Sequence, residues 1–238
     1  MRTDGPPENL VFHLAELRRR LIACAAALGL ASVAAYPFAD RIFGLLVAPL
    51  KPEPVYFTSP ADAFMIKLRI AVSTGVVIAS PFLSGQIWLF ISPALYPKEK
   101  RAILPLALAT ALFFVVGALF AFFLVLPPTV GFLIGFRTPS LQPLISVDRY
   151  VAFAVGFVLA FGVAFNLPVA VAALSFVGLV RHRDLVRWRK VVIVVLFFAA
   201  AVLTPSPDVL SQLLLGIPLV LLYEASLIAA WWIERRRK

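Results

Sequence analysis

Six long apolar stretches constrain the fold of this chain more than any other feature of its sequence. A bilayer core about 30 Å thick is crossed by roughly 20 mostly apolar helical residues. The stretches are continuous rather than alternating, and they are too long for the strands of a membrane barrel. The sequence therefore predicts an all-α integral membrane protein, a single polytopic domain over residues 1–238 with six transmembrane helices. The predicted spans are residues 21–38, 64–91, 103–126, 150–180, 191–203 and 209–233.

The composition excludes the common classes of soluble protein. Hydrophobic residues make up 62% of the chain and charged residues 14%, whereas soluble domains are roughly 45–50% apolar and about 25% charged. The net charge of +10 would suggest a nucleic-acid partner for a soluble chain. In a membrane protein, basic loops on the cytoplasmic side explain it. We therefore expect a lipid bilayer around the chain and no nucleic acid bound to it.

The basic residues also predict how the chain is oriented. If all six stretches cross with the N-terminus inside, most Lys and Arg residues fall in inside segments, including residues 18–20, 181–190 and 235–238. The fifth stretch is doubtful, because its apolar core of about 13 residues is only about 20 Å of helix. Without that crossing, residues 235–238 would lie outside, against the positive-inside rule. The sequence thus predicts six crossings with both termini cytoplasmic.

The last two spans are expected to form a tight hairpin of short helices, joined by the Pro-rich residues 204–208. A short first arm thins the bilayer or tilts its neighbours. Alternatively, Arg189 and Lys190 snorkel, so that their aliphatic stems lengthen the apolar span. Both interpretations stay open at this point.

Prolines and polar residues inside the spans predict the shape of the bundle. Each proline lacks an N–H and tends to kink its helix, so we expect several kinked helices and a curved bundle. Polar side chains in lipid should face protein, a cavity or a partner. Asn166 could cap backbone groups freed by Pro168, and Glu224 could pair with basic residues or serve a functional role. The prolines are Pro81, Pro105, Pro168 and Pro218, and the other polar residues are Gln86 and Gln212.

No motif for catalysis or metal binding is present. Cys24 is the only cysteine, and His13 and His182 form no HExxH pattern, so neither a disulfide nor a Cys/His metal site is expected. The sequence also lacks the phosphate loop G-x-x-x-x-G-K-[ST] and the nucleophile elbow G-x-S-x-G. We therefore expect no enzymatic activity and no cofactor.

Two acidic residues stand in otherwise basic segments on the predicted cytoplasmic side. Glu16 lies in the sequence His-Leu-Ala-Glu-Leu-Arg-Arg-Arg, and Glu99 lies in the loop between the second and third spans. From the residues alone, Glu16 is most simply a partner of Arg20 one helical turn away, and Glu99 is a solvated loop charge.

Taken together, several segments resemble the TatC family, the polytopic receptor subunit of the twin-arginine protein translocase. The resemblance covers nearly the whole chain, and its strength comes from the order of the segments on a six-span frame. The segments are His-Leu-x-Glu-Leu-Arg from His13, Ser-Pro-Ala-Asp-Ala-Phe at 59–64, Gln-Ile-Trp to Arg at 86–101, Phe-Gly at 161–162, Asn-Leu-Pro at 166–168, residues 204–212, and Leu-Tyr-Glu at 222–224.

The resemblance implies a receptor in the cytoplasmic (inner) membrane that binds twin-arginine signal peptides of folded cargo at its cytoplasmic face. It would assemble TatA- and TatB-like single-span partners into an oligomeric complex, with export driven by the proton gradient. A carboxylate can accept the planar fork of a guanidinium bidentately. By the resemblance, Glu16 and Glu99 are those acceptors, Phe90 and Tyr96 shape the adjoining surface, and Arg18 orients the N-terminal segment.

The resemblance further places Thr204 and Gln212 in a polar patch at the outer end of the hairpin, where they would contact a partner's helix. Such an interhelical hydrogen bond is worth about 1 kcal/mol in a membrane. The chain departs from the family at Asn166, where Glu is usual, and more mildly at Asp62, where Glu is common. A proton or charge step that needs the usual carboxylate cannot occur at Asn166, although a hydrogen-bonding role remains.

Two other functions are compatible with a helical membrane protein. A small-solute transporter or channel needs a continuous polar path, which the scattered polar residues do not obviously supply. A structural scaffold of a membrane complex needs no arginine selectivity at Glu16 or Glu99.

Overall fold

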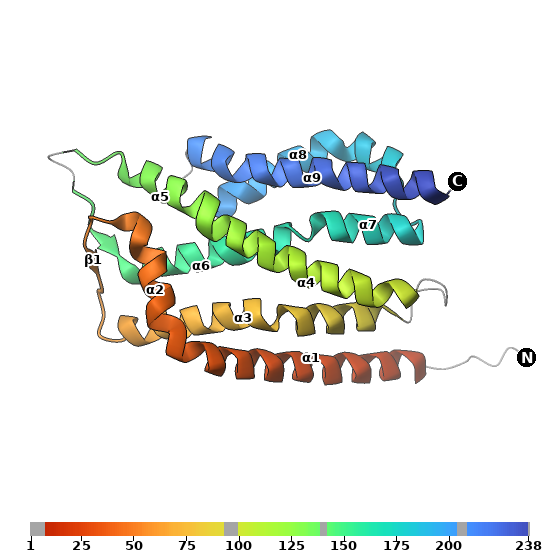
Figure 1. The fold of residues 1–238 in the computed structure, drawn as a ribbon, viewed down its shortest axis with the longest axis horizontal. Coiled ribbons are helices and arrows are strands. Elements are labelled where there is room, and N and C mark those ends of the chain that lie inside the picture. Colours follow the sequence, from red (N-terminus) through yellow and green to blue (C-terminus); the bar gives the residue numbers. More distant parts are fainter. Residues whose placement is uncertain (1–7, 93–99, 139–141, 204–208, 238) are drawn as a thin grey trace, which may run out of the picture.

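The computed structural model describes residues 8–92, 100–138, 142–203 and 209–237, and this part of the chain is almost entirely helical (Figure 1). The predicted all-α fold with six membrane-crossing helices is confirmed, although several crossings consist of more than one helix. The elements are α1 (Glu8–Ala35), α2 (Ala39–Val47), β1 (Val55–Tyr56), α3 (Asp62–Ile91), α4 (Ile103–Phe120), α5 (Leu126–Ile134), β2 (Ile145–Ser146), α6 (Val147–Ala164), α7 (Leu167–Val177), α8 (His182–Leu203) and α9 (Val209–Arg237).

The helices run back and forth between two ends of the molecule. Helix α1 begins and helix α9 ends at the same end, whereas α2 and β1 lie at the opposite end (Figure 1). Helix α1 packs along α3, which also contacts α4 and α6, and α9 packs against both α7 and α8. An even number of crossings brings both ends of the described chain to one side. That side is called the terminal end below, and the other is called the loop end.

The last two helices are longer than the predicted short helices, which is a correction to the expectation. Helix α8 has 22 residues and α9 has 29. Five helical segments of the described chain are long and apolar enough to cross a membrane, and α8 is not among them. The reason is that its first half, residues 182–190, is polar and continues the helix beyond the apolar stretch. The shortness therefore belongs to the apolar part of the fifth span and not to its helix.

Prolines interrupt some spans and are accommodated in others. In the third span a π-helical turn, Ala121–Val125, precedes Pro127 and Pro128, whose missing N–H groups leave helical carbonyls without donors. In the fourth span the helix breaks between α6 and α7, directly before Pro168. Pro81 stays inside the continuous helix α3, where Ser80 Oγ donates to Val77 O at 2.8 Å. This hydroxyl supplies the bond that the proline nitrogen cannot make.

The core centres on α6, whose buried face carries a row of aromatic rings. Phe157 and Phe161 are fully buried and have ring centroids 5.1 Å apart, and Phe120 of α4 lies 5.2 Å from Phe165. Side chains from α2, α3, α5 and α9 complete the same buried cluster. This cluster joins elements that are far apart in sequence and holds the bundle together where it borders α6.

Glycines allow the closest helix contacts, as is common between membrane helices. A Cβ on Gly75 of α3 would lie 2.5 Å from Ser32 Oγ and 2.8 Å from Ser32 N of α1. A Cβ on Gly117 of α4 would lie 2.7 Å from Phe161 O of α6. The distances between α1 and α3, and between α4 and α6, therefore depend on the absence of a side chain at these two positions.

Ion pairs and a short sheet tie the elements of the loop end together. Strands β1 and β2 are parallel, with Val55 opposite Ile145. Three ion pairs also join residues that are distant in sequence. They are Lys67 with Asp40 at 2.8 Å, Arg69 with Asp148 at 2.9 Å, and Arg137 with Glu53. Tyr150 Oη also donates to Leu46 O at 2.6 Å. The basic residues in these pairs are neutralised locally.

The closeness of α1 and α3 can be tested at Gly75. Gly75→Ala should lower the Tm of the detergent-solubilised protein by roughly 2–10 °C, because overpacking a tight contact costs about 1–3 kcal/mol. Gly29→Ala on α1 is the matched control, since no atom lies within 4 Å of its Cβ position, and it should not lower the Tm. Equal Tm values for the two variants would contradict the close contact at Gly75.

Candidate functional site

Glu16 and Arg20 form an ion pair on α1, near the terminal end of the molecule. Arg20 Nε lies 3.0 Å and Arg20 Nη2 lies 2.5 Å from the same atom, Glu16 Oε1. The side chain of Glu16 is 26% exposed and that of Arg20 is 21% exposed. The contact between residues one turn apart, which the sequence favours on local grounds, is present in the structure.

A third side chain extends this pair to the neighbouring helix. Arg20 Nη1 donates to Gln86 Oε1 of α3 at 3.0 Å, so one guanidinium bridges α1 and α3. Gln86 is half-buried, and its interhelical hydrogen bond is the structural role expected for a polar residue in lipid. The sequence does not link Arg20 to Gln86, because the two residues are 66 positions apart and no local pattern relates them.

The other predicted receptor residues divide into described and undescribed positions. Arg18 is exposed on α1, two residues from Glu16, and Phe90 is half-buried in the last turn of α3. Glu99 and Tyr96 lie outside the described residues, as does Thr204 of the predicted partner site. The structure therefore brings Glu16, Arg18 and Phe90 to one end of the α1–α3 pair and is silent on the remaining three.

Glu224 pairs with a basic residue near the terminal end. Arg189 Nε of α8 lies 2.7 Å from Glu224 Oε1 of α9, which is the pairing that the sequence left open for this residue. The Nε–H of Arg189 does not point at the buried Oε1 of Glu224, and this oxygen accepts no hydrogen bond from any described residue. Glu224 is thus held by charge attraction to an arginine whose side chain is half-exposed.

Hydrogen bonds between α8 and α9 surround this ion pair. Tyr223 Oη donates to Leu185 O at 2.7 Å, and the backbone N of His182 donates to Glu234 Oε1 at 2.6 Å. His182 Nδ1 lies 3.2 Å from Leu227 O. A carbonyl oxygen can only accept, so a hydrogen bond between these atoms requires the proton on Nδ1. These bonds fasten the polar first half of α8 to α9.

Asn166 stands at the break between α6 and α7 and satisfies a carbonyl freed there. Its Nδ2 donates to Gly162 O at 2.9 Å, while its backbone N bonds to Val163 O instead. Asn166 Oδ1 is buried and has no hydrogen-bond partner among the described residues. The side chain caps the helix break on one side and leaves an acceptor unused on the other.

Gln212, predicted to contact a partner helix, makes a bond within the chain. Its Nε2 donates to Phe197 O of α8 at 3.0 Å, so it joins the two arms of the final hairpin.

Helix α8 packs on α9 alone among the major helix contacts. Its outward apolar face carries Val191, Val194, Val195, Phe198 and Val202, all exposed.

Charge is distributed unequally between the two ends. The exposed basic residues of the terminal end come from α1, α8, α9 and the start of the third span. In the described ranges they are Arg18, Arg19, Arg101, Arg181, Arg183, Arg187, Arg189, Lys190 and Arg235, of which Arg189 is paired with Glu224. At the loop end, Lys67, Arg69 and Arg137 are paired with acids, and Arg41, Lys51 and Arg149 are exposed. The Glu16 carboxylate therefore lies in surroundings that are positive overall.

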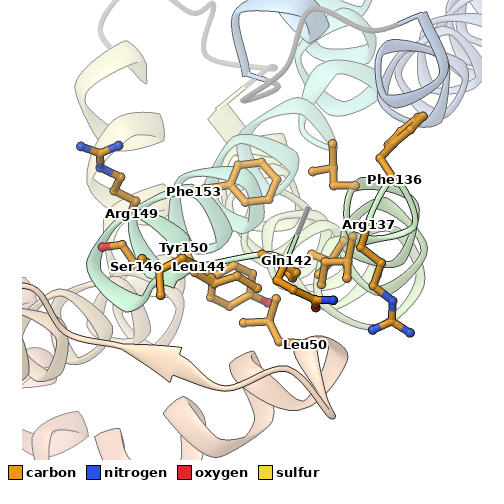
Figure 2. Close-up of a pocket in the computed structure, with 14 residues that line it drawn as sticks. Leu50, Phe136, Arg137, Gln142, Leu144, Ser146, Arg149, Tyr150 and Phe153 are labelled. Carbon is orange, nitrogen blue, oxygen red and sulfur yellow. The ribbon is translucent and has the colours of Figure 1, made fainter. Parts of the chain in front are cut away.

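A cavity lies at the loop end and is separate from Glu16. Figure 2 shows Leu50, Phe136, Leu144, Tyr150 and Phe153 among the residues that line it. The cavity has a volume of about 490 Å³, and its lining is mostly apolar. Arg137 and Arg149 extend away from its centre (Figure 2). No group of three or more His, Cys, Asp or Glu side chains is placed to hold a metal in the described ranges. The terminal end thus offers a carboxylate for cations, and the cavity offers apolar volume.

The sequence matches a protein family, and it is similar to individual relatives along almost its whole length. The family is described as Sec-independent protein translocase protein (TatC), and the match covers residues 12–218. The TatC protein of Aquifex aeolicus is 41% identical over 235 residues, which are 96% of this chain and 97% of that protein. The TatC protein of Carboxydothermus hydrogenoformans is 39% identical over 234 residues, 97% of this chain and 96% of that one.

Solved structures show the same similarity in three dimensions. A crystal structure of the twin arginine translocase receptor TatC superposes with a TM-score of 0.82 at 41% identity, covering 93% of this chain and 99% of that chain. A second structure of that receptor, in the detergent DDM, gives a TM-score of 0.83 at the same identity, with 92% and 99% coverage. The resemblance inferred from the sequence motifs is confirmed.

The contact between α8 and α9 can be tested at Tyr223. Tyr223→Phe should lower the Tm by about 2–4 °C, because it removes one buried hydrogen bond worth about 1 kcal/mol. Tyr56→Phe is the control, since Tyr56 is 47% exposed and its hydroxyl is not needed to join helices. A Tm shift in Tyr56→Phe as large as that in Tyr223→Phe would contradict the proposed importance of the Leu185 contact.

Proposed function

Because this chain belongs to the TatC family of Sec-independent protein translocase proteins, we propose that it binds twin-arginine signal peptides of folded cargo at its terminal end. The protein is the TatC subunit of a twin-arginine protein translocase, a multi-pass membrane protein that works with other Tat components. The observation that carries the proposal is the half-buried Glu16 carboxylate, which pairs with Arg20 among exposed basic residues, while Arg20 also bonds Gln86 of α3.

The chemistry of this carboxylate suits an arginine ligand. A guanidinium presents parallel N–H groups that a carboxylate accepts through two charge-assisted hydrogen bonds. The surrounding arginines repel cations, so a ligand must gain enough from specific hydrogen bonds to overcome that repulsion. Glu99 is proposed as the second acceptor for the adjacent arginine of the signal peptide, with Phe90 and Tyr96 shaping the surface beside it and Arg18 orienting the start of α1.

The charge distribution supports a cytoplasmic location for the terminal end. Basic residues are concentrated on the cytoplasmic side of membrane proteins, and more of the exposed basic residues in the described ranges lie at the terminal end than at the loop end. We place both termini in the cytoplasm and the protein in the cytoplasmic (inner) membrane. A signal peptide arriving from the site of synthesis would then meet Glu16 directly.

The final hairpin is the proposed contact for single-span TatA- and TatB-like partners. Helix α8 presents an uncovered apolar face, and Gln212 has one amide N–H and its Oε1 in addition to the N–H that bonds Phe197 O. Thr204 would complete this polar patch. Packing along α8 supplies the area of contact, and the polar patch supplies the register.

Two features bear on the alternatives and on the transport step. Hydroxyl groups within the spans, those of Ser73, Thr110, Thr129 and Ser226, donate to carbonyls of their own helices. They therefore offer little to a solute path, which disfavours a small-solute transporter. The side chain of Asn166 cannot carry out a proton step that needs the carboxylate usual at this position of the fourth span, because it is an amide.

The second proposed acceptor is tested by Glu99→Gln. Crosslinking of a twin-arginine signal peptide should fall at least about tenfold, because hydrogen bonds to a charged group are worth about 1.5–3 kcal/mol. Asp184→Asn, which neutralises another acid of the terminal end, is the matched control and should retain capture. Circular dichroism should show unchanged helix content in both. Wild-type capture by Glu99→Gln would remove Glu99 from the site.

The partner contact is tested by Gln212→Leu. Signal-peptide capture should remain, whereas crosslinks from α8 and α9 to the single-span partners should weaken or shift along the partner helix. Gln86→Leu serves as a comparison, because that residue lies on α3 and should leave the partner crosslinks in place. Unchanged partner crosslinks in Gln212→Leu would contradict the proposed polar patch.

A further inference from the structure

We propose that Arg20 is an internal occupant of the arginine site, which the signal-peptide arginine must replace on Glu16, and that Gln86 retains Arg20 after the exchange. This inference rests on the proposed function and adds a step to it. Neither Arg20 nor Gln86 is a ligand contact in the scheme above. Both act as positioning residues that set how available the Glu16 carboxylate is.

The contacts of Arg20 are those expected of an arginine ligand. Two of its N–H groups reach the carboxylate, from Nε at 3.0 Å and Nη2 at 2.5 Å, and both are received by Oε1. In the described chain no hydrogen bond reaches Glu16 Oε2. Among the described residues, only Oε1 of the Glu16 carboxylate accepts hydrogen bonds. The group that donates them is a guanidinium, the same group that the proposed ligand carries.

A second guanidinium cannot use both oxygens of Glu16 while Arg20 stays. A ligand limited to Oε2 makes one charge-assisted hydrogen bond to a carboxylate that Arg20 already neutralises, and it meets the like charge of Arg20. Bidentate binding requires Oε1, and hence the departure of Arg20. Arg20 therefore lowers the affinity of the site for any cation, and the exchange replaces one arginine–carboxylate pair by another.

Gln86 makes this exchange feasible. Arg20 is only 21% exposed, and leaving a partly buried cation without a partner is strongly unfavourable. Its Nη1 already donates to Gln86 Oε1 at 3.0 Å, an atom on α3 that does not depend on Glu16. When the ligand takes Glu16, Arg20 keeps this acceptor and remains at the α1–α3 junction.

The test measures binding of a fluorescent twin-arginine signal peptide to the full-length protein in detergent by anisotropy. Arg20→Gln should tighten binding about tenfold, because the internal competitor is gone. Arg20→Lys, which keeps the charge but has no planar fork, should tighten it about threefold. Arg19→Gln removes one charge from an exposed neighbour and should change binding less than twofold. Gln86→Leu should weaken binding several-fold, since Arg20 loses its second acceptor.

The exchange predicts tighter peptide binding by Arg20→Gln and weaker peptide binding by Gln86→Leu. A purely structural role of the two residues would weaken binding in both variants. In the double variant Arg20→Gln/Gln86→Leu, the effect of Gln86→Leu should disappear, because no arginine remains to be retained. Weaker binding by both Arg20→Gln and Arg20→Lys overturns the inference. So does an effect of Arg19→Gln equal to that of Arg20→Gln, which would indicate general charge repulsion.

The control variant Glu16→Gln tells the two proposals apart. If the wild type does not bind the peptide, or if Glu16→Gln binds it as well as the wild type, the proposed function fails. If Glu16→Gln abolishes binding while Arg20→Gln and Arg20→Lys leave it at the wild-type level or below, only the exchange fails. Circular dichroism and Tm of every variant establish that the folded protein is being compared.

Discussion

Within a bilayer, every backbone polar group must find its partner inside the protein, because lipid offers none. This constraint explains why the described chain is nearly all helix and why its irregular points carry side-chain substitutes. Ser80 donates to the carbonyl that faces Pro81, and Asn166 donates to the carbonyl freed at the break before Pro168. The hydroxyl and amide side chains of the spans serve mainly to complete the helices. Polar groups available for function are left at the ends of the bundle.

The two ends of the bundle use charge differently. At the loop end, Lys67, Arg69 and Arg137 each pair with an acid from another segment, and together with β1 and β2 they join elements distant in sequence. At the terminal end, basic residues exceed their acidic partners, and the described residues bond the Glu16 carboxylate through Oε1 only. The ion pairs between distant segments suit a structural role at the loop end, whereas the larger excess of basic residues around the Glu16 carboxylate suits the proposed recognition of a charged peptide at the terminal end.

Much of the site was predictable residue by residue, and its assembly was not. The pairing of Glu16 with Arg20 follows from a spacing of four on a helix, and the pairing of Glu224 with a basic neighbour was one of two interpretations left open. The link from Arg20 to Gln86 has no such local rule, because it depends on how α1 packs along α3. Likewise, Gln212 was assigned to a partner, whereas its amide first bonds Phe197 O inside the hairpin.

The sequence by itself determined that the chain lies in a lipid bilayer, how many times it crosses, and to which family it belongs. Long apolar stretches and the order of motifs can be read directly along the chain. The sequence also indicated that the apolar part of the fifth span is short, although not that α8 continues as a helix through its polar first half. Only the tertiary structure decided which polar atoms are already taken and which remain available, since that depends on distances between helices. The proposed receptor site is defined at this second level, where Arg20 of α1 lies between the carboxylate of Glu16 on its own helix and the amide of Gln86 on α3.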